Sequence, residues 1–115
     1  MSHKGRSGIA TIRKAQASVF AALGDETRLS LVAQLSVGQP CSISRLTGGS
    51  KLTRQAITKH LRVLESAGIV HGAHAGREKL FVFDPRPMEE SKKYLDLVSE
   101  QWDRALARLK SFVED

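Results

Sequence analysis

The feature that most constrains this chain is an amphipathic segment near its middle, residues 53–68, with the sequence TRQAITKHLRVLESAG. Apolar residues recur there at steps of three and four, which places them on one side of an α-helix. With His60, that stripe consists of Ala56, Ile57, Leu61 and Leu64. The opposite side is polar and basic, and no acidic residue occurs before Glu65. A domain built around this helix must bury one side of it and expose a cationic side.

Three further helices are expected before this segment. The first runs from about residue 9 to residue 23, and Asp25 can cap a second helix that ends before Gly38. Ser42 can cap a short third helix, which the glycine-rich run 48–50 cannot prolong. The short helix, the glycine turn and the capped polar helix that follows them form a helix-turn-helix pattern.

A β-hairpin and one long helix are expected after the amphipathic segment. The stretches 69–74 and 78–84 are rich in β-branched and aromatic residues, and they flank the turn residues 75–77. A last helix follows from about Pro87 to Val113. The predicted fold class is therefore mainly α-helical with a small β-hairpin: a winged helix-turn-helix with a long C-terminal helix.

The last helix carries an apolar seam that one small domain can hardly cover along its whole length. Packing within the same chain is the alternative, but we expect the seam to join two copies of the chain as a homodimer. The first helix is expected to contribute to the same interface. The predicted interface residues are Ile12, Val19, Met88, Leu95, Val98, Trp102, Leu109 and Phe112.

The rest of the composition limits the function classes. Residues 1–8 are expected to be a flexible basic arm or a cloning remnant, and residues 9–115 a single domain. No secretion signal and no apolar run long enough for a membrane span is apparent, so we expect a cytoplasmic protein. No Gly-rich phosphate loop or paired catalytic carboxylates predict an enzyme. The lone Cys41 excludes an internal disulfide and is expected to be buried or inert.

The positive charge of the chain is unevenly distributed. Residues 1–77 hold eleven Lys or Arg and three acids, a net charge of +8, whereas residues 78–115 have a net charge of −2. A solvated surface explains such an imbalance as readily as nucleic-acid binding does, so the position of the charges must decide.

The basic side of the 53–64 helix has the residue types that read DNA. Its first two turns combine hydroxyl, guanidinium and amide groups, and only those turns reach base edges in the major groove. Arg54 suits guanine and Gln55 suits adenine, each pair worth about 1–3 kcal/mol of discrimination. Arg77, at the hairpin tip, suits the minor groove or a phosphate, or is simply a solubilising loop residue. The predicted DNA-binding residues are Lys51, Thr53, Arg54, Gln55, Thr58, Lys59, Arg62 and Arg77.

Three stretches taken together resemble the ArsR/SmtB family of prokaryotic winged-helix repressors: VFAALGDETRLSLVAQL, LTRQAITKHLRVLESAGIV and GREKLFVFDP. The resemblance covers about residues 15–113. It implies a dimer joined by the first and last helices, the 53–64 helix in the major groove and the 72–80 hairpin as the wing. It also implies repression that an effector relieves, although the sequence identifies no effector.

Metal sensing is not expected of this chain. Metal-sensing members of the family carry cysteines in the short helix before the turn, where this sequence has Ser42 and Ser44. Their other site uses Asp and His on the last helix, and residues 87–115 contain no histidine. His71 and His74 have no acid or cysteine at ligand spacing. The chain therefore resembles the branch of the family that lacks metal sites, and no cofactor is expected.

The expected function is sequence-specific binding of double-stranded DNA by a homodimeric transcriptional repressor on an inverted-repeat operator, with autoregulation as one option. The alternative is a winged-helix module that binds another protein and has no specific DNA binding. Salt-sensitive binding to duplex DNA favours the first function, and capture of one protein partner without DNA favours the second.

Overall fold

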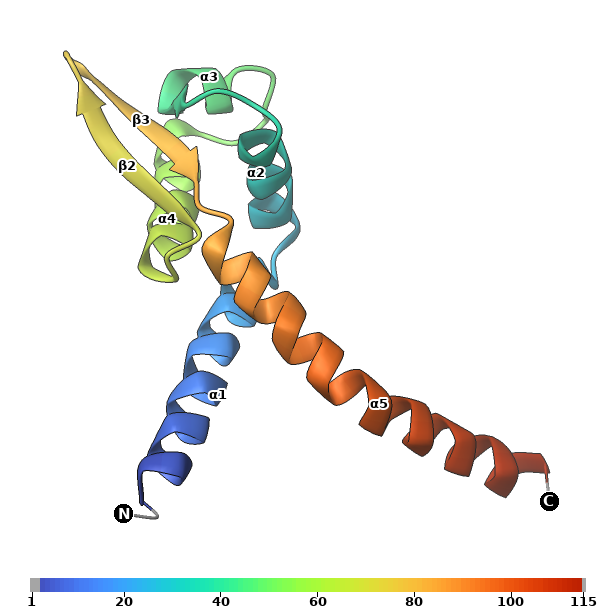
Figure 1. Cartoon of the computed structure of the whole chain (residues 1–115). Helices are drawn as coiled ribbons and strands as arrows, with labels where there is room; N and C mark the ends of the chain where they lie inside the picture. The colour runs from blue at the N-terminus through green and yellow to red at the C-terminus, as the bar shows by residue number, and fades with distance from the viewer. Residues whose placement is uncertain (1–2, 115) are drawn as a thin grey trace.

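The computed structural model describes residues 3–114 of the chain. Two helices, α1 and α5, project from a small head that holds all the other elements (Figure 1). The elements are, in order, α1 (His3–Leu23), α2 (Glu26–Ser36), β1 (Cys41–Ser42), α3 (Ile43–Thr47), α4 (Arg54–Ser66), β2 (Val70–Ala75), β3 (Glu78–Phe83) and α5 (Arg86–Glu114). This order confirms the predicted fold class, a mainly helical winged helix-turn-helix with a long last helix.

Each of the three helices inside the head begins at its predicted cap. The side chain of Asp25 accepts a hydrogen bond from the backbone amide of Arg28, at 3.0 Å. Ser42 and Thr53 cap α3 and α4 in the same way, at 3.2 and 3.1 Å. These bonds satisfy amides that lack a partner within the helix, which explains why the three starts could be predicted from single residues.

The first helix begins earlier than predicted. Residues 1–8 were expected to form a flexible arm, but α1 is helical from His3 onward, and residues 1 and 2 lie outside the described part of the chain. No proline interrupts this stretch. Each glycine in a helix costs only about 1 kcal/mol relative to alanine, so an established helix can continue through Gly5 and Gly8.

The predicted hairpin is part of a three-stranded antiparallel sheet with the strand order β1-β3-β2. Ala75 pairs with Glu78 next to the turn, where Gly76 has a φ of 67° that favours glycine. Strand β1 adds the pairs Cys41 with Phe81 and Ser42 with Leu80. This third strand was not predicted, because two residues are too few to show an alternating pattern.

The core of the head lies around the inner side of α4. Ile57, Leu61 and Leu64 are each exposed by 1% or less, and α4 contacts α1, α2, α3 and β2. The other buried apolar residues are Val19, Ala22, Leu31, Leu35, Cys41, Leu46, Ile69, Val70 and Phe81. Each fully buried aliphatic side chain contributes about 1.5–3 kcal/mol, so this packing holds α4 in one orientation.

Two residues predicted for the dimer interface pack in or against the core of the same chain. Val19 is only 5% exposed, and Met88 is partly buried against the same core. The end of α1 and the first turn of α5 close one side of the head, so their inward-facing residues are covered within a single chain. Within a single chain, Val19 therefore has almost no exposed surface left and Met88 has only part of its side chain exposed, while the dimer interface stays a prediction.

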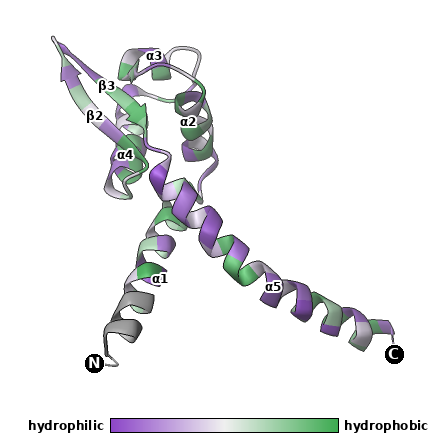
Figure 2. Cartoon of the chain, in the orientation of Figure 1, coloured by the Kyte–Doolittle hydropathy of each residue, from purple (hydrophilic) through white to green (hydrophobic). Residues whose placement is uncertain are grey.

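Beyond the head, the molecule is extended. A compact chain of this length has a radius of gyration of about 13 Å, whereas the observed value is 18.5 Å. Helices α1 and α5 diverge from a shared junction (Figure 1). At this junction the Ser91 hydroxyl donates a 2.7 Å hydrogen bond to buried Gln16. Apolar bands recur along the projecting part of α5 (Figure 2). Over residues 3–114, no helix has the length and apolar character that a membrane span requires.

We expect substitution of Leu64 by Ala to lower the free energy of unfolding by about 2–5 kcal/mol, because it leaves a cavity beneath α4. Val63→Ala is the matched control, since Val63 is the neighbouring residue but is 41% exposed. Its effect should stay within about 0.5 kcal/mol. Urea unfolding followed by circular dichroism measures both. Equal effects of the two substitutions would contradict the assignment of the core.

Candidate nucleic-acid interface

The outer side of α4 presents the predicted reading residues together. Its side chains line one shallow groove of about 430 Å³, and they are Arg54, Gln55, Thr58, Lys59 and Arg62. None of the ion pairs found within residues 3–114 involves this face. Its three positive charges are therefore available to a polyanion.

The two threonines among the predicted contacts, Thr53 and Thr58, are already engaged with the helix backbone, and only Thr58 lines the groove. The Thr53 oxygen accepts the hydrogen bond from the Ala56 amide, and the Thr58 hydroxyl donates to the carbonyl of Arg54 at 2.7 Å. A hydroxyl has a single hydrogen. Thr58 can thus offer its methyl group and an acceptor lone pair to a base, but it has no spare donor.

Unlike its neighbours on α4, Arg54 has a side chain that reaches α3. Its guanidinium Nη1 donates to the Ser44 hydroxyl oxygen of α3, at 3.3 Å. The remaining two predicted contacts lie apart from the groove on α4. Lys51 is exposed in the turn before α4, and Arg77 is exposed at the tip of the β2–β3 hairpin.

A second hollow, a cleft of about 170 Å³, lies where α3, the start of α4 and the hairpin meet. Its lining residues are Ser42, Ile43, Ser44, Arg54, His74, Arg77, Glu78 and Lys79. Arg54 lines both hollows. The cleft therefore lies between the hairpin and the helix-turn-helix, and Arg54 lies where the cleft meets the groove on α4.

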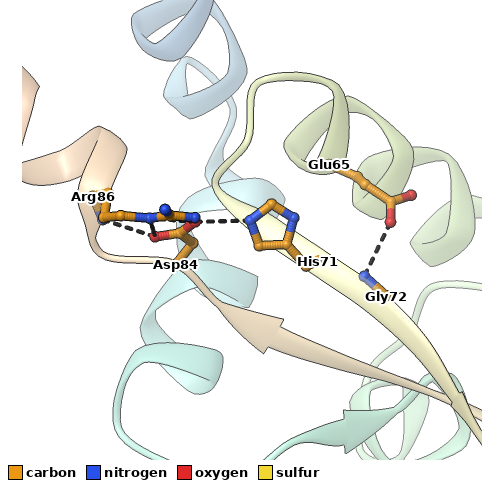
Figure 3. Close-up of polar contacts among 5 residues, drawn as sticks. All are labelled: Glu65, His71, Gly72, Asp84 and Arg86. Atoms are coloured by element: carbon orange, nitrogen blue, oxygen red, sulfur yellow. Dashed lines mark hydrogen bonds and ion pairs between the residues drawn. The ribbon is translucent and has the colours of Figure 1, made fainter.

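One contact in the middle of the hairpin ties it to α4. The Glu65 carboxylate accepts a 3.0 Å hydrogen bond from the backbone amide of Gly72 in β2 (Figure 3). A Cβ atom at position 72 would lie 3.1 Å from the Phe81 ring and 3.2 Å from the Glu65 carboxylate, so both neighbours would have to move by a few tenths of an ångström, and the end of the Lys79 side chain would have to move aside. Glycine therefore suits this close approach, which the hydrogen bond from its backbone to Glu65 maintains.

A second contact ties the base of the hairpin to α5. Asp84 is 8% exposed; its carboxylate lies 2.8 Å from Nε2 of His71 and accepts a 2.7 Å bond from Nη2 of Arg86 (Figure 3). The hydrogen bonds from the Arg86 side chain, from its backbone amide and from His71 hold the pKa of Asp84 well below its usual value of 3.8. Asp84 likewise raises the pKa of Arg86.

Arg28 connects α1 to α4 at the back of the reading helix. Its Nε donates to the carbonyl of Ala22 at the end of α1, at 2.6 Å, and its Nη1 lies 3.2 Å from Nδ1 of His60 on α4. His60, which the apolar stripe predicted to be inward-facing, is partly buried in this contact. The Arg28 amide in turn holds the pKa of Asp25 below its usual value.

Several residues of this interface were missed by sequence reasoning. Ser44 and Glu65 carry no motif of their own, because their hydrogen-bond partners are 10 and 7 residues away on another element. Lys79, which lines the cleft, was also missed. The segment 84–87, Asp-Pro-Arg-Pro, held a detectable signal, since an acid and a base bracket the expected boundary. Within the described chain, no three His, Cys, Asp or Glu side chains converge on a site for a metal ion.

Comparisons with known proteins give similar architectures. A family of helix-turn-helix domains matches residues 23–73. The uncharacterized HTH-type transcriptional regulator YuzN of Bacillus subtilis is 35% identical over 66% of this chain and 89% of its own. The HTH-type transcriptional repressor SmtB of Mycobacterium tuberculosis is 31% identical over 61% of this chain and 51% of its own. The solved ArsR-like transcriptional regulator from Rhodococcus sp. RHA1 is 36% identical, covers 87% of this chain and 93% of its own, and has a TM-score of 0.71.

We expect Asp84→Asn to make the stability of the fold fall less steeply as the pH is lowered below neutrality. A carboxylate whose pKa is lowered by folding stabilises the fold fully above its unfolded value, about 4, and this contribution is lost as the pH falls through the folded value. Asparagine cannot titrate, so the variant is less stable at neutral pH and loses less on acidification. Thermal unfolding between pH 7 and pH 2 measures this, with Asp103→Asn on exposed α5 as control. If the unfolding temperature of the variant fell with decreasing pH as steeply as that of the wild type, the role of Asp84 would be contradicted.

Proposed function

The chain belongs to the ArsR/SmtB family of winged helix-turn-helix transcriptional regulators, and on that premise we propose that it represses transcription by binding an inverted-repeat operator as a homodimer. The chain is a DNA-binding regulator. Repression is supported by the name of one relative, the repressor SmtB. The proposed location is the cytoplasm, where prokaryotic DNA lies.

The observation that carries the proposal is the unpaired basic face of α4. A major groove about 12 Å wide admits one α-helix, and its walls are lines of phosphates. Gln55 is exposed on the first turn and makes no side-chain hydrogen bond among the described residues. The oxygen and the nitrogen of its side-chain amide are therefore both free to read adenine. Lys59 and Arg62 lie further along the helix, where the backbone is the nearer partner.

The proposed dimer rests on the apolar stripe of α5. This helix has 29 residues and is about 43 Å long at ~1.5 Å per residue, and α1 is its main packing partner within the chain. Its exposed large apolar residues are Leu95, Leu97, Trp102, Leu106, Leu109, Phe112 and Val113. All of these except Leu97 share one side of the helix with half-buried Val98. A second copy of the chain covers this stripe, and Ile12 of α1, 56% exposed, joins it.

Two-fold symmetry sets the form of the operator. Two copies of α4 related by a two-fold axis read the same bases on opposite strands, which requires an inverted repeat. Half-sites on one side of the duplex are centred about 34 Å, or one helical turn, apart. We test this by selecting bound duplexes from a random pool, with and without zinc and a reducing agent. Failure to enrich any sequence would contradict the proposed function.

A base contact and a phosphate contact of α4 should respond differently to substitution when binding to the enriched duplex is measured. Gln55→Ala removes a base contact, so it should lower the preference for one base pair by about 1–3 kcal/mol. Lys59→Ala removes a phosphate contact, so it should weaken binding to every sequence and reduce the salt slope by about one. Fluorescence anisotropy over a salt series measures both variants. Wild-type affinity and selectivity in both would contradict the reading helix.

The dimer is tested with a matched pair of leucines on α5. Leu109→Glu places a charge in the stripe and should give a monomer, because a charge buried without a partner is costly. Leu97→Glu is the control; Leu97 is 72% exposed, more than Leu109 at 57%, but lies off the stripe. Sedimentation equilibrium at micromolar concentration distinguishes the two. A monomeric wild-type protein, or a dimer that survives the change at Leu109, would contradict the proposed interface.

A further inference from the structure

The position of the wing beside α4 defines where one DNA strand must pass. The major groove and the adjacent minor groove are separated by a single sugar-phosphate backbone. If α4 lies in the first groove and the hairpin reaches the second, that backbone crosses the cleft between them. This step rests on the proposed function. The cleft is bounded by α3, the first turn of α4 and the wing, and has a volume of about 170 Å³.

Arg54 lies on the side of α4 that faces this cleft. It is eleven residues before Glu65, which amounts to about 20° around the helix axis, so both share one side of α4. Glu65 contacts the wing directly through the Gly72 amide. The Ser44 hydroxyl accepts a hydrogen bond from Arg54 and so holds the guanidinium toward α3. Arg54 also lines the reading groove with Gln55 and Lys59, so its guanidinium is held at the edge of that groove next to the cleft.

The cleft has the chemistry of an anion site. Arg54, Arg77 and Lys79 bring three positive charges to it, and Glu78 brings one negative charge. The Lys79 ammonium lies 5.3 Å from the centre of the Phe81 ring, which keeps that charge beside the wing. Ser44 still has its hydroxyl hydrogen to donate, since its oxygen is the acceptor for Arg54. No ion pair found among residues 3–114 neutralises these three cations.

We propose that this cleft binds one phosphodiester group of the DNA backbone in each half-site, with Arg54 and Arg77 as its two cationic ligands. Arg54 is then a phosphate ligand and not the guanine reader that its position on α4 predicts. The fork of the guanidinium matches two oxygens of a phosphate. Arg77 closes the cleft from the wing, so a single phosphate fixes the wing and the reading helix on the same strand.

A salt series with paired substitutions tests the sharing of one phosphate. The salt slope counts the phosphates that are neutralised, not the cations that neutralise them. Either arginine alone still neutralises the shared phosphate, so Arg54→Ala and Arg77→Ala should each change the slope little, whereas the double variant should reduce it by about one. Arg62→Ala is the matched control and should reduce the slope by about one on its own, because Arg62 does not line the cleft.

A neutral-phosphate scan locates the site on the DNA. Methylphosphonate replaces each phosphate of the enriched duplex in turn. One position per half-site, at the border between the bases read by α4 and the flanking minor groove, should cost the wild type about tenfold in affinity. The same replacement should cost the variant lacking both Arg54 and Arg77 less than about twofold.

A substitution of Glu78 tests the proposal by a change that should strengthen binding to DNA. Glu78→Gln removes the only negative charge that lines the cleft, so it should tighten binding to every duplex by several fold at low salt. Glu100→Gln, an equal change of charge on α5, should leave the affinity unchanged. No tightening in Glu78→Gln would overturn the assignment.

The outcomes separate the cleft from the function on which it rests. If wild-type protein binds no duplex, the proposed function and the phosphate site fall together. If it binds an operator but Arg54→Ala relaxes the preference at one base pair, Arg54 reads a base and the cleft assignment alone is overturned. A loss of about one from each single variant and about two from the double variant overturns it equally. Uniform weakening with unchanged base preference, together with a slope that falls only in the double variant, supports it.

Discussion

The burial of one side of α4 is the constraint on which the rest of the structure depends. Ile57, Leu61 and Leu64 are almost completely removed from water, and elements from both halves of the chain pack around them. A helix that buries this stripe has no freedom to rotate, because rotation would expose the stripe and bury charged groups in its place. The outward direction of Gln55 and Lys59 is therefore a consequence of core packing.

Two polar contacts turn the head into a single unit. Glu65 binds the middle of the wing through a backbone amide, and Asp84 binds its base through His71 and Arg86. A hairpin of two strands is marginally stable alone, so these bonds and the short strand β1 hold it against the helix-turn-helix. The cleft that we assign to a phosphate has a defined width because both of its walls are held in this way.

The same head is joined to the two projecting helices by a small number of bonds. Arg28 contacts the last carbonyls of α1 and reaches His60 on the back of α4, and Gln16 and Ser91 join α1 to α5 where the helices diverge. A change in the angle between α1 and α5 would therefore be transmitted to the reading helix through buried or half-buried groups. In a dimer built on these helices, the spacing of the two reading helices would depend on that angle.

Local rules account for what the sequence alone determined. Asp25, Ser42 and Thr53 predicted three helix starts because a cap acts on amides two or three residues away, and periodic apolar residues predicted which side of α4 is buried. The outward basic face, and with it the class of ligand, follows from the same pattern.

Tertiary structure decided the features that depend on contacts between distant residues. Val19 packs in the core, since the elements that cover it follow it by many residues. The direction of Arg54 depends on Ser44 of another helix, and the place of the wing depends on Gly72 allowing a carboxylate close to its backbone. Periodicity states which side of an element is apolar, but only the assembled fold determines which partner that side meets.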